Sequence, residues 1–132
     1  MSKTDTAEKA LSEAREWLST AELALSHCKT GAPASVACAE AIHAIIRAND
    51  ALTIHFLNRK ATRHDDMPFL FLDLLRQGKL EKTHEHFHSL LSRALHAKSG
   101  ADYGRQMFTL QDADYFVKGA REFLDVVAGC IK

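Results

Sequence analysis

The 132-residue sequence has no excess of either charge, no long apolar run and no segment with the alternation of a β-strand. Its 17 basic and 17 acidic residues cancel, so an anionic ligand would need a local basic patch. No stretch approaches the roughly 20 apolar residues of a membrane span. The opening MSKTDTAEKA also has no apolar signal core. We therefore expect a cytoplasmic protein with no membrane partner.

The three cysteines are odd in number and form no CxxC pair, which excludes a full disulfide framework and the common zinc-ribbon spacing. Cys28, Cys38 and Cys130 all fall on or beside apolar helix faces. This placement is typical of buried thiols in a reducing compartment.

Phosphate-loop and nucleophile-elbow patterns are also missing. Gly100 and Gly104 flank a short loop, but no strand precedes it and no Lys-Ser/Thr pair follows it. No segment resembles the elbow around a catalytic serine. The chain therefore offers none of the common local signatures of a nucleotide hydrolase or a serine hydrolase.

One segment, from His84 to His88, matches the HExxH pattern of zinc proteases. On a helix its two end histidines would share a face, but a zincin also needs a third ligand. The next candidates are His96 and Asp102, and the extended form ending in Gly-x-x-His is absent. We expect no resident metal or other cofactor.

Helical periodicity dominates the chain, most clearly between residues 34 and 64. Apolar residues there recur every three or four positions, which places them on one face of a long central helix. They are Val36, Ala37, Ala41, Ile42, Ile45, Ala48, Leu52 and Phe56.

The remaining boundaries follow from local stop and start signals. Gly31 and Pro33 end a first helix, Gly78 ends a short one, and Thr109 with Asp112 resembles a capping box. The expected helices cover residues 7–28, 34–58, 67–77, 80–97 and 109–132, with a loop at 101–108. We predict one all-α domain over residues 1–132, an up-and-down bundle of four long helices plus one short helix.

The short helix at 67–77 is apolar almost all round. Its large side chains are Phe69, Leu70, Phe71, Leu72, Leu74 and Leu75. Only one face of so short a helix can turn inward, so the rest would form an exposed patch of the kind that marks association sites. We expect this helix to mediate a homodimer.

A polar strip interrupts the central helix. His43, Arg47 and Asp50 are spaced by four and three residues, so they share one side. Arg47 follows two isoleucines, and its charge therefore needs a partner. Two interpretations stay open: a functional polar strip, and a set of structural ion pairs.

Four segments together resemble a HEPN domain, the small helical domain of prokaryotic toxin–antitoxin, defence and RNA-processing systems. They are AREWLSTAELAL at 14–25, ACAEAIHAIIRANDAL at 37–52, Ala-Asp-Tyr at 101–103 and AREFL at 120–124. The resemblance implies the same all-α fold, and it implies binding of nucleotide or RNA.

Active HEPN members cut RNA with an Arg, four to six residues, then a His. Arg59 and His64 have this spacing, although they follow the second helix instead of lying near the start of a later one. At the later place Arg93 and His96 stand too close together. The resemblance implies that Arg59 and His64 are catalytic. Candidate nucleotide- or RNA-binding residues are Arg47, Arg63, Lys98, Asp102 and Tyr103.

The first hypothesis is thus a HEPN-like domain that binds nucleotide or RNA, paired with a nucleotidyltransferase-like protein in a toxin–antitoxin system. In metal-independent cleavage, His64 would move the proton of the 2′-hydroxyl or of the leaving group. Arg59 or Arg63 would stabilise the charge of the phosphorane. The second hypothesis is a non-catalytic helical adaptor or dimerisation module that uses the short apolar helix.

Overall fold

A computed structural model describes the backbone of residues 5–61, 66–103 and 108–131, and the side chains of these ranges except 99–103. The elements are α1 (Ala7–Cys28), α2 (Ala34–Leu57), α3 (Met67–Arg76), the 3₁₀-helix η2 (Lys82–His84), α4 (Phe87–Tyr103) and α5 (Leu110–Ile131). No strand occurs in these ranges. The predicted all-α bundle with four long helices and one short helix is confirmed.

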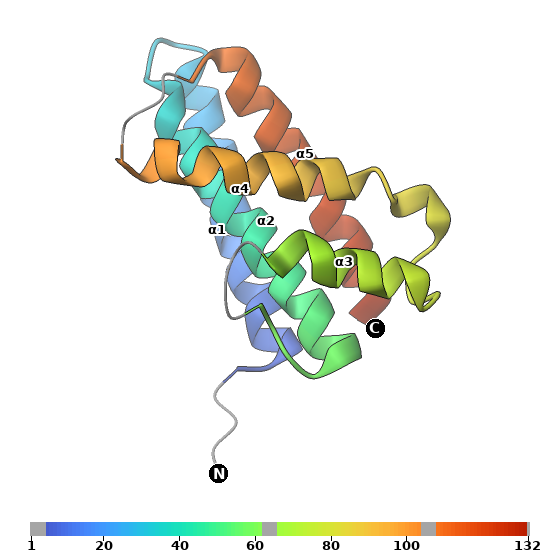
Figure 1. Ribbon diagram of the computed structural model, residues 1–132. Coiled ribbons are helices and arrows are strands. Elements are labelled where there is room, and N and C mark those ends of the chain that lie inside the picture. The colour runs from blue at the N-terminus through green and yellow to red at the C-terminus, as the bar shows by residue number, and fades with distance from the viewer. Residues whose placement is uncertain (1–4, 62–65, 104–107, 132) are drawn as a thin grey trace.

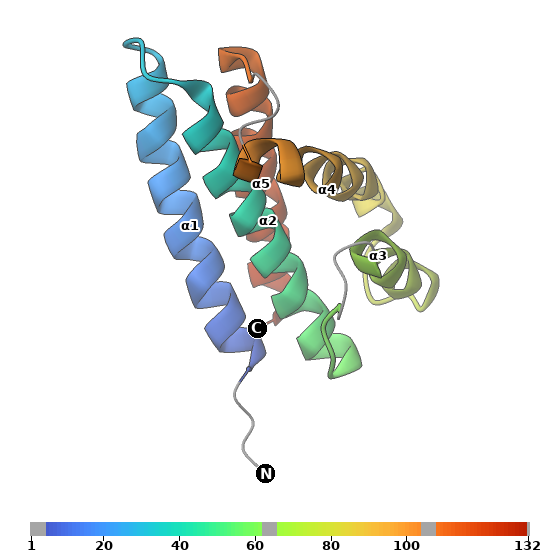
Figure 2. The same cartoon turned by 60° about the vertical axis from the view of Figure 1, so that its left-hand side comes forward.

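The helices form a bundle of three, with two more lying across it. α1 and α2 make an antiparallel hairpin, and α5 lies alongside and runs in the same direction as α2 (Figure 1). Turned by 60°, the bundle shows α3 and α4 on the opposite side of α2 from α1 (Figure 2). α2 packs against each of the other four α-helices, as expected for the central helix.

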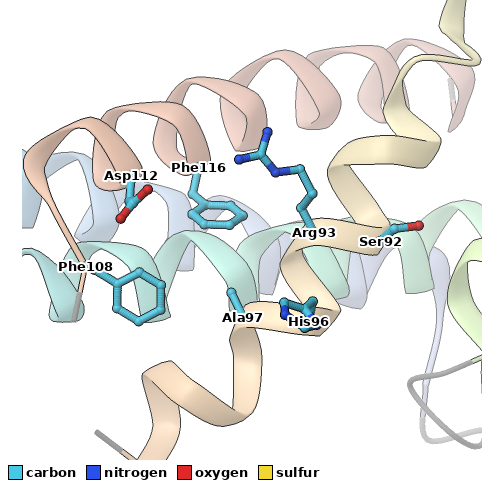
Figure 3. A pocket seen from close by; sticks show the side chains of 7 residues that line it. All are labelled: Ser92, Arg93, His96, Ala97, Phe108, Asp112 and Phe116. Carbon is cyan, nitrogen blue, oxygen red and sulfur yellow. The ribbon is translucent and has the colours of Figure 1, made fainter. Parts of the chain in front are cut away.

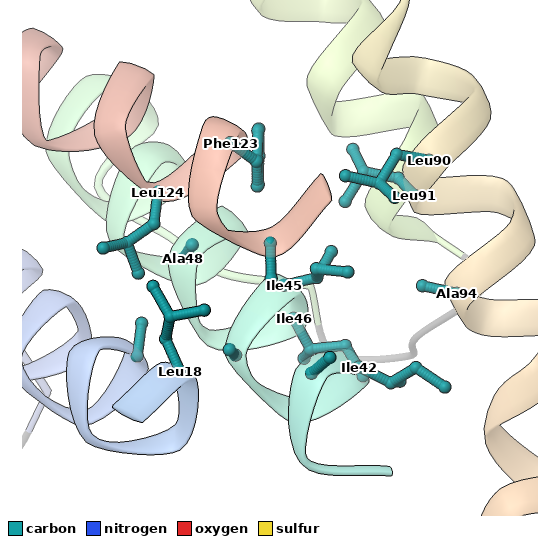
Figure 4. Packing of buried hydrophobic residues seen from close by; sticks show 14 of the residues in the cluster. Leu18, Ile42, Ile45, Ile46, Ala48, Leu90, Leu91, Ala94, Phe123 and Leu124 are labelled. Atoms are coloured by element: carbon teal, nitrogen blue, oxygen red, sulfur yellow. The ribbon is translucent and has the colours of Figure 1, made fainter. Parts of the chain in front are cut away.

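Alanines let the neighbouring helices approach α2 closely. Ala37, Ala41 and Ala51 are fully buried, and the larger Ile42 and Ile45 between them are at most 1% exposed. Figure 4 shows side chains from α1, α2, α4 and α5 meeting around these isoleucines. None of the described helices is long and apolar enough to cross a membrane.

Local signals set most of the helix ends as predicted. Thr6 caps α1, where its Oγ1 accepts a hydrogen bond of 3.0 Å from the Lys9 backbone N–H. Gly31 takes a φ of +110° in the turn after α1, a conformation that only glycine adopts easily. The Thr109–Asp112 capping box is confirmed, with reciprocal hydrogen bonds of 2.9 and 3.1 Å.

The predicted bounds of the fourth helix, 80–97, are wrong at both ends. Leu80 is buried as a separate anchor, and Glu81 is extended before η2, so the α-helix begins only at Phe87. The helix then continues through Ser99 and Gly100 to Tyr103. A glycine inside a helix costs only about 1 kcal/mol, which does not suffice to end it. Residues 101–103 of the expected loop therefore belong to the helix.

α4 crosses α5 closely at Gly119. A Cβ atom on this glycine would lie only 2.7 Å from Leu90 Cδ1, so the absence of a side chain lets α4 settle against α5. Leu90 itself is 5% exposed. This crossing places the first turn of α4 against the middle of α5. Further along, the middle of α4 lies next to the first turns of α5.

Asn49 is a polar exception in the core of α2. It is 1% exposed, and neither its Oδ1 nor its Nδ2 has a hydrogen-bond partner among the described residues. Thr53, one turn later and also buried, donates to the Asp50 carbonyl at 3.3 Å. The amide of Asn49 therefore lowers the stability of the bundle.

Candidate functional site

Arg47 lies at the centre of an ion-pair cluster that joins α1 to α2. Its Nε donates to Glu13 Oε1 at 2.7 Å, and its Nη2 donates to Asp5 Oδ1 at 2.7 Å. Its Nη1 donates to Asp5 Oδ2 at 3.1 Å and to Asp50 Oδ2 at 3.0 Å. The arginine side chain is only 15% exposed. Most of its hydrogen-bonding capacity is therefore used by carboxylates.

The charges of this cluster shift the pKa values of its members. Hydrogen bonds from Arg47 hold the pKa of Asp5 at about 2, and Lys60 Nζ adds an ion pair to Asp5 at 2.9 Å. Burial raises the pKa of Asp50, although the hydrogen bond from Arg47 opposes this shift. Three carboxylates around one guanidinium repel a phosphate. Of the two interpretations left open by the sequence, the geometry favours structural ion pairs.

The predicted catalytic pair is only half described. Arg59 is exposed just after α2, beside a groove of about 380 Å³. Asp66, Phe69 and Asp73 line the same groove from the side of α3. Arg63 and His64 lie outside the described residues. A shared site of Arg59 and His64 therefore stays a prediction.

The other predicted binding residues all lie at the C-terminal end of α4. Lys98 is half-buried there, and Asp102 and Tyr103 form part of the last turn. The side chains of Asp102 and Tyr103 lie outside the described part of the chain. Lys98, Asp102 and Tyr103 thus belong to one helix, α4, whereas Arg47 belongs to α2 and Arg59 follows it.

An open pocket of about 250 Å³ lies between α4 and α5, next to this helix end. Figure 3 shows side chains of α4 facing those of α5 and of the residues just before it, while the Ser92 hydroxyl points away from them. The lining residues are Ser92, Arg93, His96, Ala97, Phe108, Asp112 and Phe116. It is a small pocket that combines aromatic rings with a cation, an imidazole and a carboxylate.

An aromatic ring, and no described carboxylate, holds the Arg93 side chain in place. Its guanidinium carbon lies 4.1 Å from the centre of the Tyr115 ring, which fixes the side chain by a cation–π contact. Arg93 is exposed, and it forms no ion pair with any carboxylate that the structure describes. An anionic group at the pocket mouth could therefore bind its N–H groups.

Asp112 is the acidic group of this pocket, and the capping box fixes it. Its Oδ2 accepts the Thr109 backbone N–H at 2.9 Å, and its own N–H donates to Thr109 Oγ1 at 3.1 Å. Burial, and after it the charge of Asp112, raises the pKa of the Cys38 thiol to about 12. Cys38 is therefore a neutral thiol, and Asp112 supplies the local negative charge.

Two of the pocket residues, Arg93 and His96, have a helical spacing that is visible in the sequence. Arg93 and His96 were too close together for the RNA-cutting spacing, but a separation of three places both on one face of a helix. That signal was available. Phe108 and Asp112 come from the far side of a loop, and only the fold brings them to the same pocket.

The HExxH segment does not form a zincin helix. His84 belongs to η2, whereas His88 belongs to the first turn of α4. His86 Nδ1 lies 2.9 Å from the Thr83 carbonyl, as part of the local turn. No three His, Cys, Asp or Glu side chains in the described ranges are placed to hold a metal ion.

Comparison with protein-family models and with curated proteins finds no match to this chain. The likeness to HEPN domains is therefore carried by the four sequence segments alone.

Proposed function

We propose that this chain is a HEPN-like domain that binds a nucleotide or RNA in the pocket between α4 and α5. The observation that carries the proposal is the position of Arg93, which lies beside a pocket with aromatic residues and forms no ion pair with any carboxylate in the described part of the chain. Bases unstacked from RNA bind to proteins by stacking on aromatic rings and by hydrogen bonds to their edges. Phe108, which is half-buried, provides such a ring, and Phe116 adds the edge of an almost fully buried ring.

Two polar groups of the pocket, on Arg93 and His96, have distinct parts in this binding. Arg93 binds phosphate with its exposed guanidinium, and His96, which is also exposed on α4, offers a hydrogen bond to the sugar or phosphate. Lys98 and the Ala-Asp-Tyr segment continue along the same helix, where a longer RNA would extend.

The proposal is tested by titrating the protein with the four ribonucleoside monophosphates and with short single-stranded RNA. We expect Arg93→Ala to weaken binding about tenfold or more, because a charge-assisted hydrogen bond contributes roughly 1.5–3 kcal/mol. Arg121→Ala is the matched control, since this arginine is also exposed but forms a two-point ion pair with Glu22. Wild-type protein that binds none of these ligands would refute the proposal.

Metal-independent RNA cleavage by Arg59 and His64 is the catalytic part of the proposal, and it rests on the HEPN resemblance. His64→Ala should then lower the cleavage rate by 10²- to 10⁴-fold in the presence of a chelator. The thermal melt should be unchanged. Cleavage that persists in this variant would assign the activity to other residues, or to a contaminant.

The resemblance also supplies the proposed setting: a cytoplasmic toxin–antitoxin component paired with a nucleotidyltransferase-like protein. The three cysteines are free thiols, which accords with a reducing compartment. A nucleotidyltransferase gene next to this one, and a stable complex of the two purified products in gel filtration, would support the pairing.

One observation favours the second hypothesis, a helical adaptor or dimerisation module. Phe69 on α3 is 66% exposed, the largest exposed fraction among the bulky apolar residues described. Leu72 and Leu75 are half-buried beside it and border a groove of about 480 Å³. Self-association through α3 is compatible with nucleotide binding, because the two surfaces lie on different helices.

A further inference from the structure

Resting on the proposed function, we propose that Asp112 makes the α4–α5 pocket selective for bases that carry an exocyclic amino group. These bases are adenine, cytosine and guanine, and the base rejected is uracil. The carboxylate reaches the pocket from α5, whereas the cation Arg93 reaches it from α4. Figure 3 shows the Phe116 ring between the two charged groups.

The separation of the charges orients a nucleotide. Its phosphate is repelled by Asp112 and attracted by Arg93, so the base points toward α5. Phe116 is 5% exposed and Phe108 is half-buried, and both supply apolar surface for the base between the charged ends. At about 250 Å³ the pocket is below the usual range for drug-sized ligands, and its size suits a single base.

The carboxylate then reads the edge of the base. An ionised carboxylate only accepts hydrogen bonds, so it pairs with N–H groups such as the amino groups of adenine, cytosine or guanine. Uracil has one ring N–H, flanked by two carbonyl oxygens, and these oxygens are repelled by the carboxylate. Asp112 Oδ2 already accepts the Thr109 N–H at 2.9 Å, which fixes its position and leaves Oδ1 for the ligand.

The test compares AMP, CMP, GMP and UMP in calorimetric titrations of the wild-type protein and of Asp112→Asn. The asparagine retains an oxygen for the capping bond to Thr109, but it presents an amide NH₂ where Oδ1 stood. We expect wild type to bind the three amino-bearing nucleotides about tenfold or more tighter than UMP. In Asp112→Asn we expect this preference to be lost or reversed.

Asp114→Asn is the matched control, because this carboxylate is on the same helix but pairs with Lys118 at 2.9 Å, and it does not line the pocket. This variant should prefer the amino-bearing nucleotides over UMP to the same extent as wild type.

A second comparison uses wild-type protein alone. AMP should bind about tenfold tighter than purine riboside 5′-monophosphate, which differs from AMP only by the missing amino group.

Different results would overturn base selection by Asp112 and nucleotide binding in the pocket. If all four nucleotides bind wild type equally and AMP binds no better than its deamino analogue, base selection by Asp112 is overturned while binding in the pocket stands. If no nucleotide binds at all, the proposed function is overturned and the selectivity with it.

Discussion

Arg47 has most of its N–H groups directed at Asp5, Glu13 and Asp50, while its own side chain is 15% exposed. Such a cluster contributes little net stability when complete, since burying its charges is costly. It becomes strongly destabilising when one partner is removed. The structural role of Arg47 is therefore to join α2 to α1 and to the residues just before α1 through its ion pairs.

We expect Arg47→Ala to lower the free energy of unfolding by about 3 kcal/mol, because Asp5, Glu13 and Asp50 would lose the cation that contacts all three. Urea denaturation measures this. Arg121→Ala breaks an exposed ion pair and should cost less than about 1 kcal/mol. Unchanged stability of the Arg47 variant, with weaker nucleotide binding, would restore the binding strip as the correct interpretation.

The same cluster makes stability depend on pH in the acid range. The pKa of Asp5 is about 2 in the folded chain, against an ordinary value of 3.8, so the folded state favours its charged form. This stabilisation is complete above pH 4 and is lost as the pH falls toward 2. Asp50 acts in the opposite sense, because burial raises its pKa and its protonation relieves a buried charge.

The melting temperature should therefore fall as the pH is lowered from 5 to 2. Protonation of Asp5 should account for about 1–2 kcal/mol of the lost free energy of unfolding. Asp5→Asn cannot titrate, so its curve should start lower and be flatter over this interval. A variant curve parallel to that of wild type would show that other carboxylates control the acid transition.

At the scale of the element, the capping box determines where α5 begins. The N–H groups of a first helical turn have no partners within the helix, and Thr109 Oγ1 accepts one of them. Thr109→Ala should cost about 1 kcal/mol in urea denaturation, whereas Thr109→Ser should lie within a few tenths of wild type. Equal losses in both variants would point to the methyl group of the threonine instead of its hydroxyl.

Local signals of this kind explain which elements were predictable from the sequence. Gly31 and the Thr109–Asp112 pair act within a few residues, and the helix ends they predict are found in the structure. The start of α4 depends instead on the separate burial of Leu80, which is a tertiary effect.

The candidate site was much harder to predict than the fold. Glu13 is 34 residues from Arg47 in the chain, so the sequence alone could not decide between a ligand and an ion pair. Phe108 and Asp112 meet Arg93 only because α4 crosses α5 at Gly119. Neither spacing nor periodicity contains this information.

At the scale of the whole molecule, the predicted self-association would depend on Phe69. Burying a phenylalanine that is 66% exposed is favourable, so we expect light scattering at micromolar concentration to give twice the chain mass of 14.7 kDa. Phe69→Lys should return the protein to the monomer. Leu23→Lys is the control, since Leu23 is 60% exposed but lies on α1.

A clean monomer for the wild type would contradict dimerisation through α3. A dimer that Leu23→Lys disrupts, and that Phe69→Lys does not, would move the interface to α1.

The layered arrangement of the helices also has a consequence for how the native state opens. α3 and α4 lie together across one side of α2, while α1, α2 and α5 pack along one another (Figure 2). Native-state hydrogen exchange should therefore find two cooperative units, with amides of α3 and α4 exchanging at a lower free energy than those of α2. The proposed nucleotide, bound between α4 and α5, would join the two units. Its addition should slow exchange in α4 most, and amide protection would then report ligand binding without any change in the average structure.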